Sequence, residues 1–141
     1  MTQEDKELLL KDLCGRLPFG VKVDVNQSEL QNYDYKWKNW NFDEEPQEID
    51  GVSIYGVTFG CMDMSDGVIG FEYIKPYLFP LSSMTEEQTE ELIKLINTGQ
   101  NDNNEFMRSL CRIDFYHRHH LDYRNLIPMG LANDSTGLNI Y

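Results

Sequence analysis

The chain has 141 residues, enough for one domain with a packed core and too few for two independent cores. Its formal net charge of -12, from 24 acidic residues against 12 lysines and arginines, disfavours binding to nucleic acids, because phosphate backbones require clustered cations. Apolar residues make up 40% of the sequence and charged residues 26%, which predicts a folded protein rather than a disordered one.

The sequence predicts neither a secretory signal nor a membrane span. Its first residues, MTQEDKELLLKDL, lack a basic region followed by a long apolar run. No window approaches the roughly 18 apolar residues that cross a bilayer. Cys14, Cys61 and Cys111 are widely spaced and form no CxxC motif, which favours reduced thiols. We therefore expect a cytoplasmic protein.

A helix is predicted over residues 1–18. Thr2 can cap its first turn, and the acids that follow favour the positive end of the helix dipole. Its apolar stripe consists of Leu9, Leu10, Leu13 and Leu17. The residues expected to end it are Gly15, Pro18 and Gly20.

Residues 19–80 are predicted to form a small antiparallel sheet. Strands are indicated where apolar and polar side chains alternate or where β-branched and aromatic residues gather. The segments with this pattern are 21–25, 33–42, 52–62 and 68–74. A turn at Asp50-Gly51 would precede the third segment, and a turn at 63–67 would join it to the fourth in a hairpin. Such a short, curled sheet could take the form of an SH3-like barrel.

Two prolines limit how the chain continues after this hairpin. Pro76 and Pro80 lack the amide that a strand ladder needs. We therefore expect residues 75–81 to be an extended crossover or an edge segment.

Residues 81–130 are predicted to be mainly helical. A first helix should begin after Ser83 or Thr85, either of which can cap it, and should end at Gly99. Its buried stripe would consist of Leu92, Leu95 and Ile96.

A longer helix should run from residue 103 or 104 towards His120. Its apolar face would consist of Phe106, Leu110 and Ile113. A short helix over 123–129 would follow, capped by the carboxylate of Asp122. The tail, residues 131–141, could dock as a last strand or stay free.

The predicted fold class is therefore α+β. A single domain over residues 1–141 would combine an N-terminal helix, a small antiparallel sheet and C-terminal helices packed on it.

All three histidines lie in YHRHHLDYRNLI, residues 116–127. On a helix, Asp114, His117 and His120 would fall within about a third of the circumference and could form an open zinc site with water in the fourth position. A small metal-dependent hydrolase is the function that this site would imply. Against it, the spacing is not H-E-x-x-H, and histidines near a helix end also complement the helix dipole. Asp122 as a cap likewise favours a purely structural junction.

The aromatic residues Tyr33, Tyr35 and Trp37 would share one face of their strand. That face could stack on a sugar or a base, or it could be the core side of the sheet. The acidic residues of 43–48 argue against nucleic acid here. No P-loop, G-x-S-x-G or G-x-G-x-x-G motif is present, so no cofactor and no catalytic residue is expected.

Four blocks of sequence resemble a family of small uncharacterised proteins that are encoded in prophages and mobile elements of gut bacteria. The blocks are EDKELLLKDLCGRLPFGVKV, IKPYLFPLSSMTEEQ, HHLDYRNLIPMGLA and TGLNIY, together 55 residues in chain order. Residues 24–72 and 93–115 match nothing in it. The resemblance implies a phage or mobile-element origin and a bacterial cytosol, and it supplies no catalytic residues.

The resemblance also divides the histidine-rich segment. The residues of this segment that carry the resemblance are His119, His120, Asp122, Tyr123 and Arg124. His117 lies outside the four blocks, in a stretch in which members of the family differ. We therefore expect a noncatalytic accessory protein that binds another protein. The residues expected to make such a contact are His119, His120, Tyr123 and Arg124. The acidic surface could also mimic nucleic acid towards a basic host protein.

Overall fold

The computed structural model describes residues 1–42, 45–60, 62, 66–98 and 105–141, without the side chain of Tyr35. Its α-helices are α1 (Gln3–Arg16), α2 (Gln27–Tyr33), α3 (Glu86–Thr98) and α4 (Glu105–Arg118). Its 3-10 turns are η1 (Leu17–Phe19), η2 (Tyr35–Asn39), η3 (Phe71–Tyr73) and η4 (Leu81–Ser83). Its strands are β1 (Lys22–Val25), β2 (Gln47–Ser53), β3 (Gly56–Phe59), β4 (Ile74–Pro80), β5 (Leu121–Asp122) and β6 (Asn133–Asp134). The predicted α+β class is confirmed.

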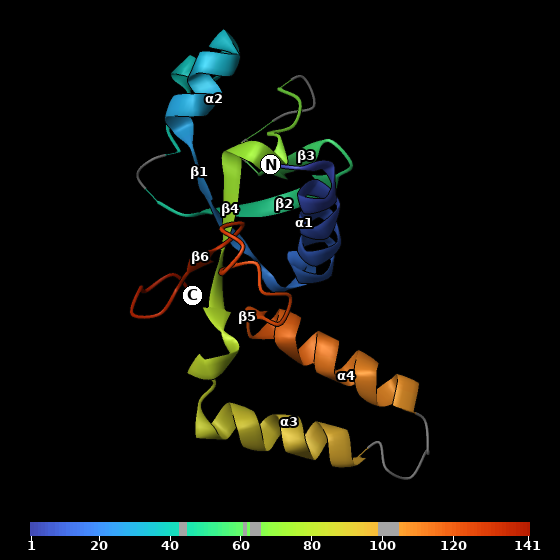
Figure 1. Cartoon of the computed structure of the whole chain (residues 1–141). Helices are drawn as coiled ribbons and strands as arrows, with labels where there is room; N and C mark the ends of the chain where they lie inside the picture. The colour runs from blue at the N-terminus through green and yellow to red at the C-terminus, as the bar shows by residue number, and fades with distance from the viewer. Residues whose placement is uncertain (43–44, 61, 63–65, 99–104) are drawn as a thin grey trace.

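The six strands form one mixed sheet in the order β3-β2-β1-β4-β5, with β6 also paired to β4 (Figure 1). The pairs from β3 to β4 are antiparallel, whereas β5 and β6 run parallel to β4. Over the described residues the sheet does not close, so it does not take the barrel form that the sequence allowed. Helix α1 packs on β2 and η3, and α3 and α4 lie side by side beyond the end of β4 (Figure 1).

The first helix begins as predicted. The hydroxyl of Thr2 accepts a hydrogen bond from the Asp5 amide, and the Asp5 carboxylate accepts one from the Thr2 amide. This reciprocal pair stabilises the first turn. Gly15 does not end the helix, which continues to Arg16.

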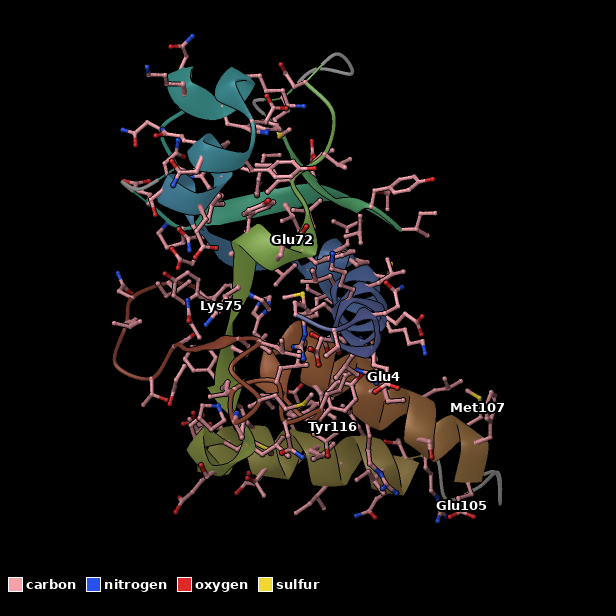
Figure 2. All side chains as sticks on the ribbon, turned by 45° about the horizontal axis from the view of Figure 1, so that its top comes forward. Glu4, Glu72, Lys75, Glu105, Met107 and Tyr116 are labelled. Carbon is pink, nitrogen blue, oxygen red and sulfur yellow. The ribbon has the colours of Figure 1, made fainter. Side chains whose placement is uncertain are left out.

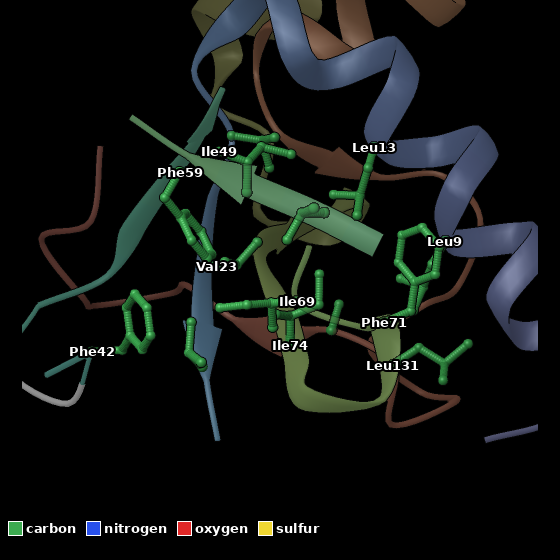
Figure 3. Close-up of a cluster of buried hydrophobic side chains, with 14 of the residues drawn as sticks. Leu9, Leu13, Val23, Phe42, Ile49, Phe59, Ile69, Phe71, Ile74 and Leu131 are labelled. Atoms are coloured by element: carbon green, nitrogen blue, oxygen red, sulfur yellow. The ribbon is translucent and has the colours of Figure 1, made fainter. Parts of the chain in front are cut away.

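Leucines of α1 contribute to a core that lies between this helix and the sheet (Figure 3). The residues of the core include Leu9, Leu13, Val23, Ile49, Phe59, Ile69, Phe71 and Ile74. Full burial of each such side chain stabilises the fold by about 1.5–3 kcal/mol. The sheet is thereby anchored to α1.

The strand predicted over residues 33–42 is wrong. Tyr33 ends α2 and Trp37 lies in η2, so the expected aromatic face does not form. The buried side chain of Gln27 holds this segment: its amide nitrogen donates to the carbonyls of Trp37 and Trp40, and its oxygen accepts from the Phe42 amide. Trp37 is buried in the core, whereas Tyr33 is 77% exposed.

Residues 75–80 are extended, as predicted, but they are neither a crossover nor an edge segment, because β4 lies inside the sheet and pairs with β1, β5 and β6. In an antiparallel ladder, hydrogen-bonded and non-hydrogen-bonded residue pairs alternate. The Asn26 amide donates to the Tyr73 carbonyl, so the next hydrogen-bonded pair is Asp24 and Lys75. Pro76 lies opposite Val23, at a position where no hydrogen bond to β1 is expected. The missing amide of Pro76 therefore costs no bond to β1.

The hairpin of β2 and β3 is turned at Ile54 and Tyr55, so Asp50-Gly51 is not the turn but part of β2, beside a bulge. The segment 68–74 is not a full strand, since it pairs with β3 only through a bridge from Ile69 to Val57 and then forms η3. Most of the predicted turn at 63–67 lies outside the described residues, as do Cys61 and Gly99.

Thr85 caps α3 as one of the predicted alternatives, because its hydroxyl accepts from the Gln88 amide and the Gln88 side chain accepts from the Thr85 amide. The short helix predicted over 123–129 is wrong, since turns occupy that segment. The tail docks, with β6 pairing to β4. Among the described residues, no helix combines the length and the apolar character needed to cross a bilayer.

Candidate functional site

A buried ion pair on α1 is the first component of the region where the ends of α1 and α4 meet. Asp12 and Arg16 are one helical turn apart, with the Arg16 Nε 2.6 Å from the Asp12 Oδ2 and both side chains 0% exposed. Arg16 also donates to the carbonyls of Tyr116 and Leu121, at 3.3 and 2.8 Å. These bonds offset the cost of burying the guanidinium and join α1 to the end of α4 and to β5.

Arg124 and Tyr123 extend this pair. The Arg124 Nε lies 3.3 Å from the Asp12 Oδ1, so one carboxylate faces two guanidinium groups. Both guanidinium groups also lie over the Tyr123 ring, Arg124 at 4.7 Å and Arg16 at 5.8 Å from its centroid. We call Asp12, Arg16, His117, Tyr123 and Arg124 the buried network.

The last member, His117, closes the buried network from α4. Its Nε2 lies 2.9 Å from the Tyr123 hydroxyl. Burial, assisted by the charge of Arg16, lowers the pKa of His117, and burial raises the pKa of Tyr123. Both groups are therefore held neutral near pH 7, which suits a structural hydrogen bond.

The three residues of the predicted zinc site are not brought together. Asp114 is exposed and pairs with Arg118 at 2.7 Å, while His117 points into the buried network. His120 lies beyond the end of α4, with a φ of 52°. Over the parts of the chain that the structure describes, no group of three or more histidine, cysteine or acidic side chains is placed to hold a metal ion.

His120 is instead part of the docking site for the tail. Its ring stacks on that of Tyr141, with centroids 3.8 Å apart and planes 9° from parallel. Burial and the charge of Arg16 lower its pKa to about 4. Its carbonyl accepts from the Phe79 amide, so this residue, just beyond the end of α4, begins the pairing of β5 with β4.

Tyr141 continues the ladder between β1 and β4 at the point where these strands separate. Its hydroxyl accepts from the Lys22 amide at 3.1 Å and donates to the Tyr77 carbonyl at 2.8 Å. Lys22 and Tyr77 would be the next hydrogen-bonded pair of an uninterrupted ladder. Burial raises the pKa of Tyr141 to about 12, so the hydroxyl stays a donor.

His119 lies in a third environment, between α3 and α4. Its Nε2 is 3.2 Å from a carboxylate oxygen of Glu91, its Nδ1 is 3.4 Å from the Gln88 amide nitrogen, and its ring packs on Phe115. The four residues predicted to bind a partner therefore make internal contacts in three different places: His119 with α3, His120 with Tyr141, and Tyr123 and Arg124 in the buried network.

Sequence reasoning missed the Asp12–Arg16 pair, whose only local signal is opposite charges four residues apart.

Asp122 holds the chain after β5. Its carboxylate oxygens accept from the amides of Leu126 and Ile127, at 2.8 and 2.9 Å. The prediction that Asp122 would bind free amides was made for a helix start, whereas the structure uses it for a turn. Its role is to close that turn.

A polar cleft lies between the end of β1, the start of α2 and the start of β4. Its volume is about 450 Å³, and its charged lining residues are Asp24, Glu72 and Lys75. Figure 2 labels two of these residues, Glu72 on η3 and Lys75 on β4. Its lining, as far as the structure describes it, contains neither histidine nor cysteine, so it provides no imidazole base and no thiol nucleophile.

A different kind of surface lies on α4. Phe106, Met107, Leu110 and Ile113 are 66%, 46%, 44% and 36% exposed, and we call these four residues the α4 stripe. Phe106, Leu110 and Ile113 were predicted from their spacing to form one apolar face, but the body of the protein does not bury that face. In α3, which the structure describes from end to end, no residue is buried either. Figure 2 shows Glu105 and Met107 at the end of α4 that lies far from the sheet.

No protein-family model matches the chain, and no match was found among curated proteins or solved structures.

Proposed function

We propose that the protein is a noncatalytic accessory protein that acts by binding another protein through the α4 stripe. The observation that carries this proposal is the exposure of four large apolar side chains on successive turns of one helix. Clustered apolar exposure of this kind is typical of protein interaction surfaces. The predicted binding residues His119, His120, Tyr123 and Arg124 would then support the surface from within.

The polar side chains of the buried network form hydrogen bonds within the protein, which favours binding over catalysis as the function. His117 and Tyr123 bond to each other, and Arg16 bonds to Asp12 and to two carbonyls. A general base has to reach a substrate proton, and these groups face the interior. The cytoplasmic location and the phage or mobile-element origin are part of the same proposal, and they are supported by the sequence resemblance.

Photo-crosslinking in bacterial cells tests this function. A photoreactive residue at position 110 of the full chain should give discrete crosslinked protein bands. The matched control carries it at position 54, because Ile54 is 71% exposed but lies on the hairpin of β2 and β3. Bands at position 110 should disappear when Ile113→Glu is added. Equal labelling from both positions would contradict the proposal.

A further inference from the structure

We propose that the place where Tyr141 docks is a recognition site for tyrosine, which the tail of the chain occupies until a tyrosine-bearing segment of a partner protein displaces it. This inference goes beyond the proposed function, because the site does not include the α4 stripe. Three features support it: the site is formed without the tail, it selects a phenol hydroxyl, and the tail can leave without opening the core.

The body of the protein holds the site in place. Lys22 lies in β1, Tyr77 and Phe79 lie in β4, and His120 lies just before β5; we call these four residues the tyrosine site. The ladder of β1 and β4 positions the first two, and the bond from the Phe79 amide to the His120 carbonyl positions the others. None of these bonds involves the tail. A partner segment would therefore meet a preorganised site, which lowers the cost of binding.

The site selects a hydroxyl at the tip of an aromatic ring. Where β1 and β4 separate, the Lys22 amide has a proton to donate and the Tyr77 carbonyl has a lone pair to share. The Tyr141 hydroxyl accepts from the amide at 3.1 Å and donates to the carbonyl at 2.8 Å. A single phenol oxygen does both, whereas a phenylalanine ring does neither. Because unpaired backbone groups are costly, the site favours tyrosine over phenylalanine.

The site also binds the ring and the backbone before it. The ring of Tyr141 stacks on that of the buried His120, with centroids 3.8 Å apart, and Phe79 lies against it at 6.0 Å. The Lys22 ammonium donates to the Ile140 carbonyl at 2.8 Å. The class of ligand is therefore a peptide segment in which the residue before the tyrosine leaves its carbonyl free.

The tail is a ligand that can be exchanged. Tyr141 is 42% exposed, so it can leave without the core opening. Residues 136–139 are exposed, and the chain loops out after β6 before it returns towards β4 (Figure 1). Segments with few buried contacts open locally at low cost. Two copies of net charge -12 repel each other, which favours another protein over a second copy as the source of the displacing tyrosine.

Peptide titration followed by NMR tests the site in the full chain. The ligand is a peptide of residues 136–141, and its control replaces the tyrosine by phenylalanine. Tyr141→Ala leaves the tyrosine site empty, so its Lys22 amide signal should shift with a Kd on the order of 0.1 to 1 mM. The phenylalanine peptide should bind about fivefold more weakly. Wild type should bind the tyrosine peptide about tenfold more weakly than Tyr141→Ala, because its own tail competes at a millimolar effective concentration.

Two lysines on neighbouring strands provide a matched control. In the Tyr141→Ala protein, Lys22→Met removes the ammonium that binds the peptide carbonyl but keeps the backbone amide, and it should weaken binding about threefold or more. Lys75→Met, at an exposed position of β4, should leave binding unchanged. Tyr141→Phe is a second receptor that keeps the ring in place. It should bind the tyrosine peptide more tightly than wild type and more weakly than Tyr141→Ala.

Several outcomes would overturn the tyrosine site. They are no shift of the Lys22 amide at about 5 mM peptide in either receptor, equal binding of the two peptides, and equal binding by wild type and Tyr141→Ala. Wild-type dimers in sedimentation that vanish in Tyr141→Ala would assign the tyrosine to a second copy and overturn the partner protein. These measurements do not involve Ile113, so their failure leaves the crosslinking test of the α4 stripe intact.

Discussion

The backbone of Gly15 in α1 lies directly against the imidazole ring of His117 in α4, so that a methyl group on Gly15 would overlap the ring. This contact brings the two helices close enough for Arg16 to reach the carbonyls of Tyr116 and Leu121. A glycine inside a helix normally costs about 1 kcal/mol relative to alanine, so its presence here reflects packing and not helix propensity.

Gly15→Ala should therefore destabilise the protein, contrary to the usual effect in a helix. The overlap with His117 is expected to exceed the gain in helix propensity, with a net loss of about 1–2 kcal/mol in the free energy of unfolding. Urea denaturation measures this loss. Cys14→Ala, at the exposed neighbouring position, should change stability by less than about 0.5 kcal/mol. A Gly15→Ala protein as stable as wild type would show that the helix contact is loose.

Asp12→Ala should be among the most damaging single substitutions. It leaves the guanidinium of Arg16 buried without its carboxylate, and such losses cost about 3–5 kcal/mol. The double substitution Asp12→Leu and Arg16→Met should lose less, because it removes both fully buried charges and leaves only the partly exposed Arg124 without its carboxylate. Lys6→Ala is the control: it breaks a partly exposed pair with Glu72 and should cost less than about 1 kcal/mol. If Asp12→Ala and Lys6→Ala lowered the free energy of unfolding by similar amounts, water would have access to the Asp12–Arg16 pair and the buried network would be wrongly described.

Asp122→Ala should lower stability by about 2 kcal/mol, because the amides of Leu126 and Ile127 lose their acceptors. Asp122→Asn keeps one side-chain oxygen and should fall between Asp122→Ala and wild type. Thermal unfolding of the three proteins gives the order. If Asp122→Asn lost as much stability as Asp122→Ala, the single oxygen that asparagine retains would contribute nothing, and both carboxylate oxygens would be needed to close the turn.

Tyr141→Phe should open the ladder where β1 and β4 separate. The Lys22 amide and the Tyr77 carbonyl both lose the hydroxyl between them, at a cost of about 1 kcal/mol. Hydrogen exchange followed by NMR should show faster exchange of the Lys22 amide. Tyr55→Phe, at a 74% exposed tyrosine, should leave that rate unchanged. An unchanged Lys22 rate in Tyr141→Phe would mean that water replaces the hydroxyl without loss.

Stability should fall as the pH is lowered from 6.5 towards 4. His120 has a pKa of about 4 in the folded protein against an ordinary value of 6.5, so in this range the unfolded chain binds a proton that the folded chain does not. The stabilisation is complete above pH 6.5, and the loss approaches about 3 kcal/mol near pH 4. The lowered pKa of His117 adds a loss in the same direction.

Urea unfolding between pH 7.5 and 5.5 measures this effect before most carboxylates titrate. His120→Asn, whose side chain tolerates the left-handed backbone at this position, should show a shallower pH dependence than wild type. Equal slopes for the two proteins would assign the effect to other groups.

Local sequence signals predicted the starts of α1 and α3 and the backbone-binding role of Asp122. In each case donor and acceptor lie three to five residues apart, so the residues themselves contain the interaction. The strand predicted over 33–42 failed because Gln27 supplies hydrogen bonds to Trp37, Trp40 and Phe42 from outside it. Alternation of side chains could not reveal that partner.

The candidate site was predicted less well than the fold. The zinc hypothesis assumed that Asp114, His117 and His120 continue one helix, but α4 ends at Arg118 and His120 turns onto Tyr141. The buried network was missed because Arg16 finds its carbonyl acceptors 100 and 105 residues further along the chain. Periodicity did identify the apolar face of α4, but not that the body of the protein leaves it exposed.

The sequence by itself therefore determined the α+β class, the caps of α1 and α3 and the apolar face of α4, because these depend on neighbours within a few residues or on composition. Only the tertiary structure decided which faces are covered, that β4 lies inside the sheet, and that Asp12 and Arg16 are buried together. The physical reason is that burial and strand pairing depend on partners distant in sequence, as Lys22, Tyr77 and Tyr141 show at the fork of two strands.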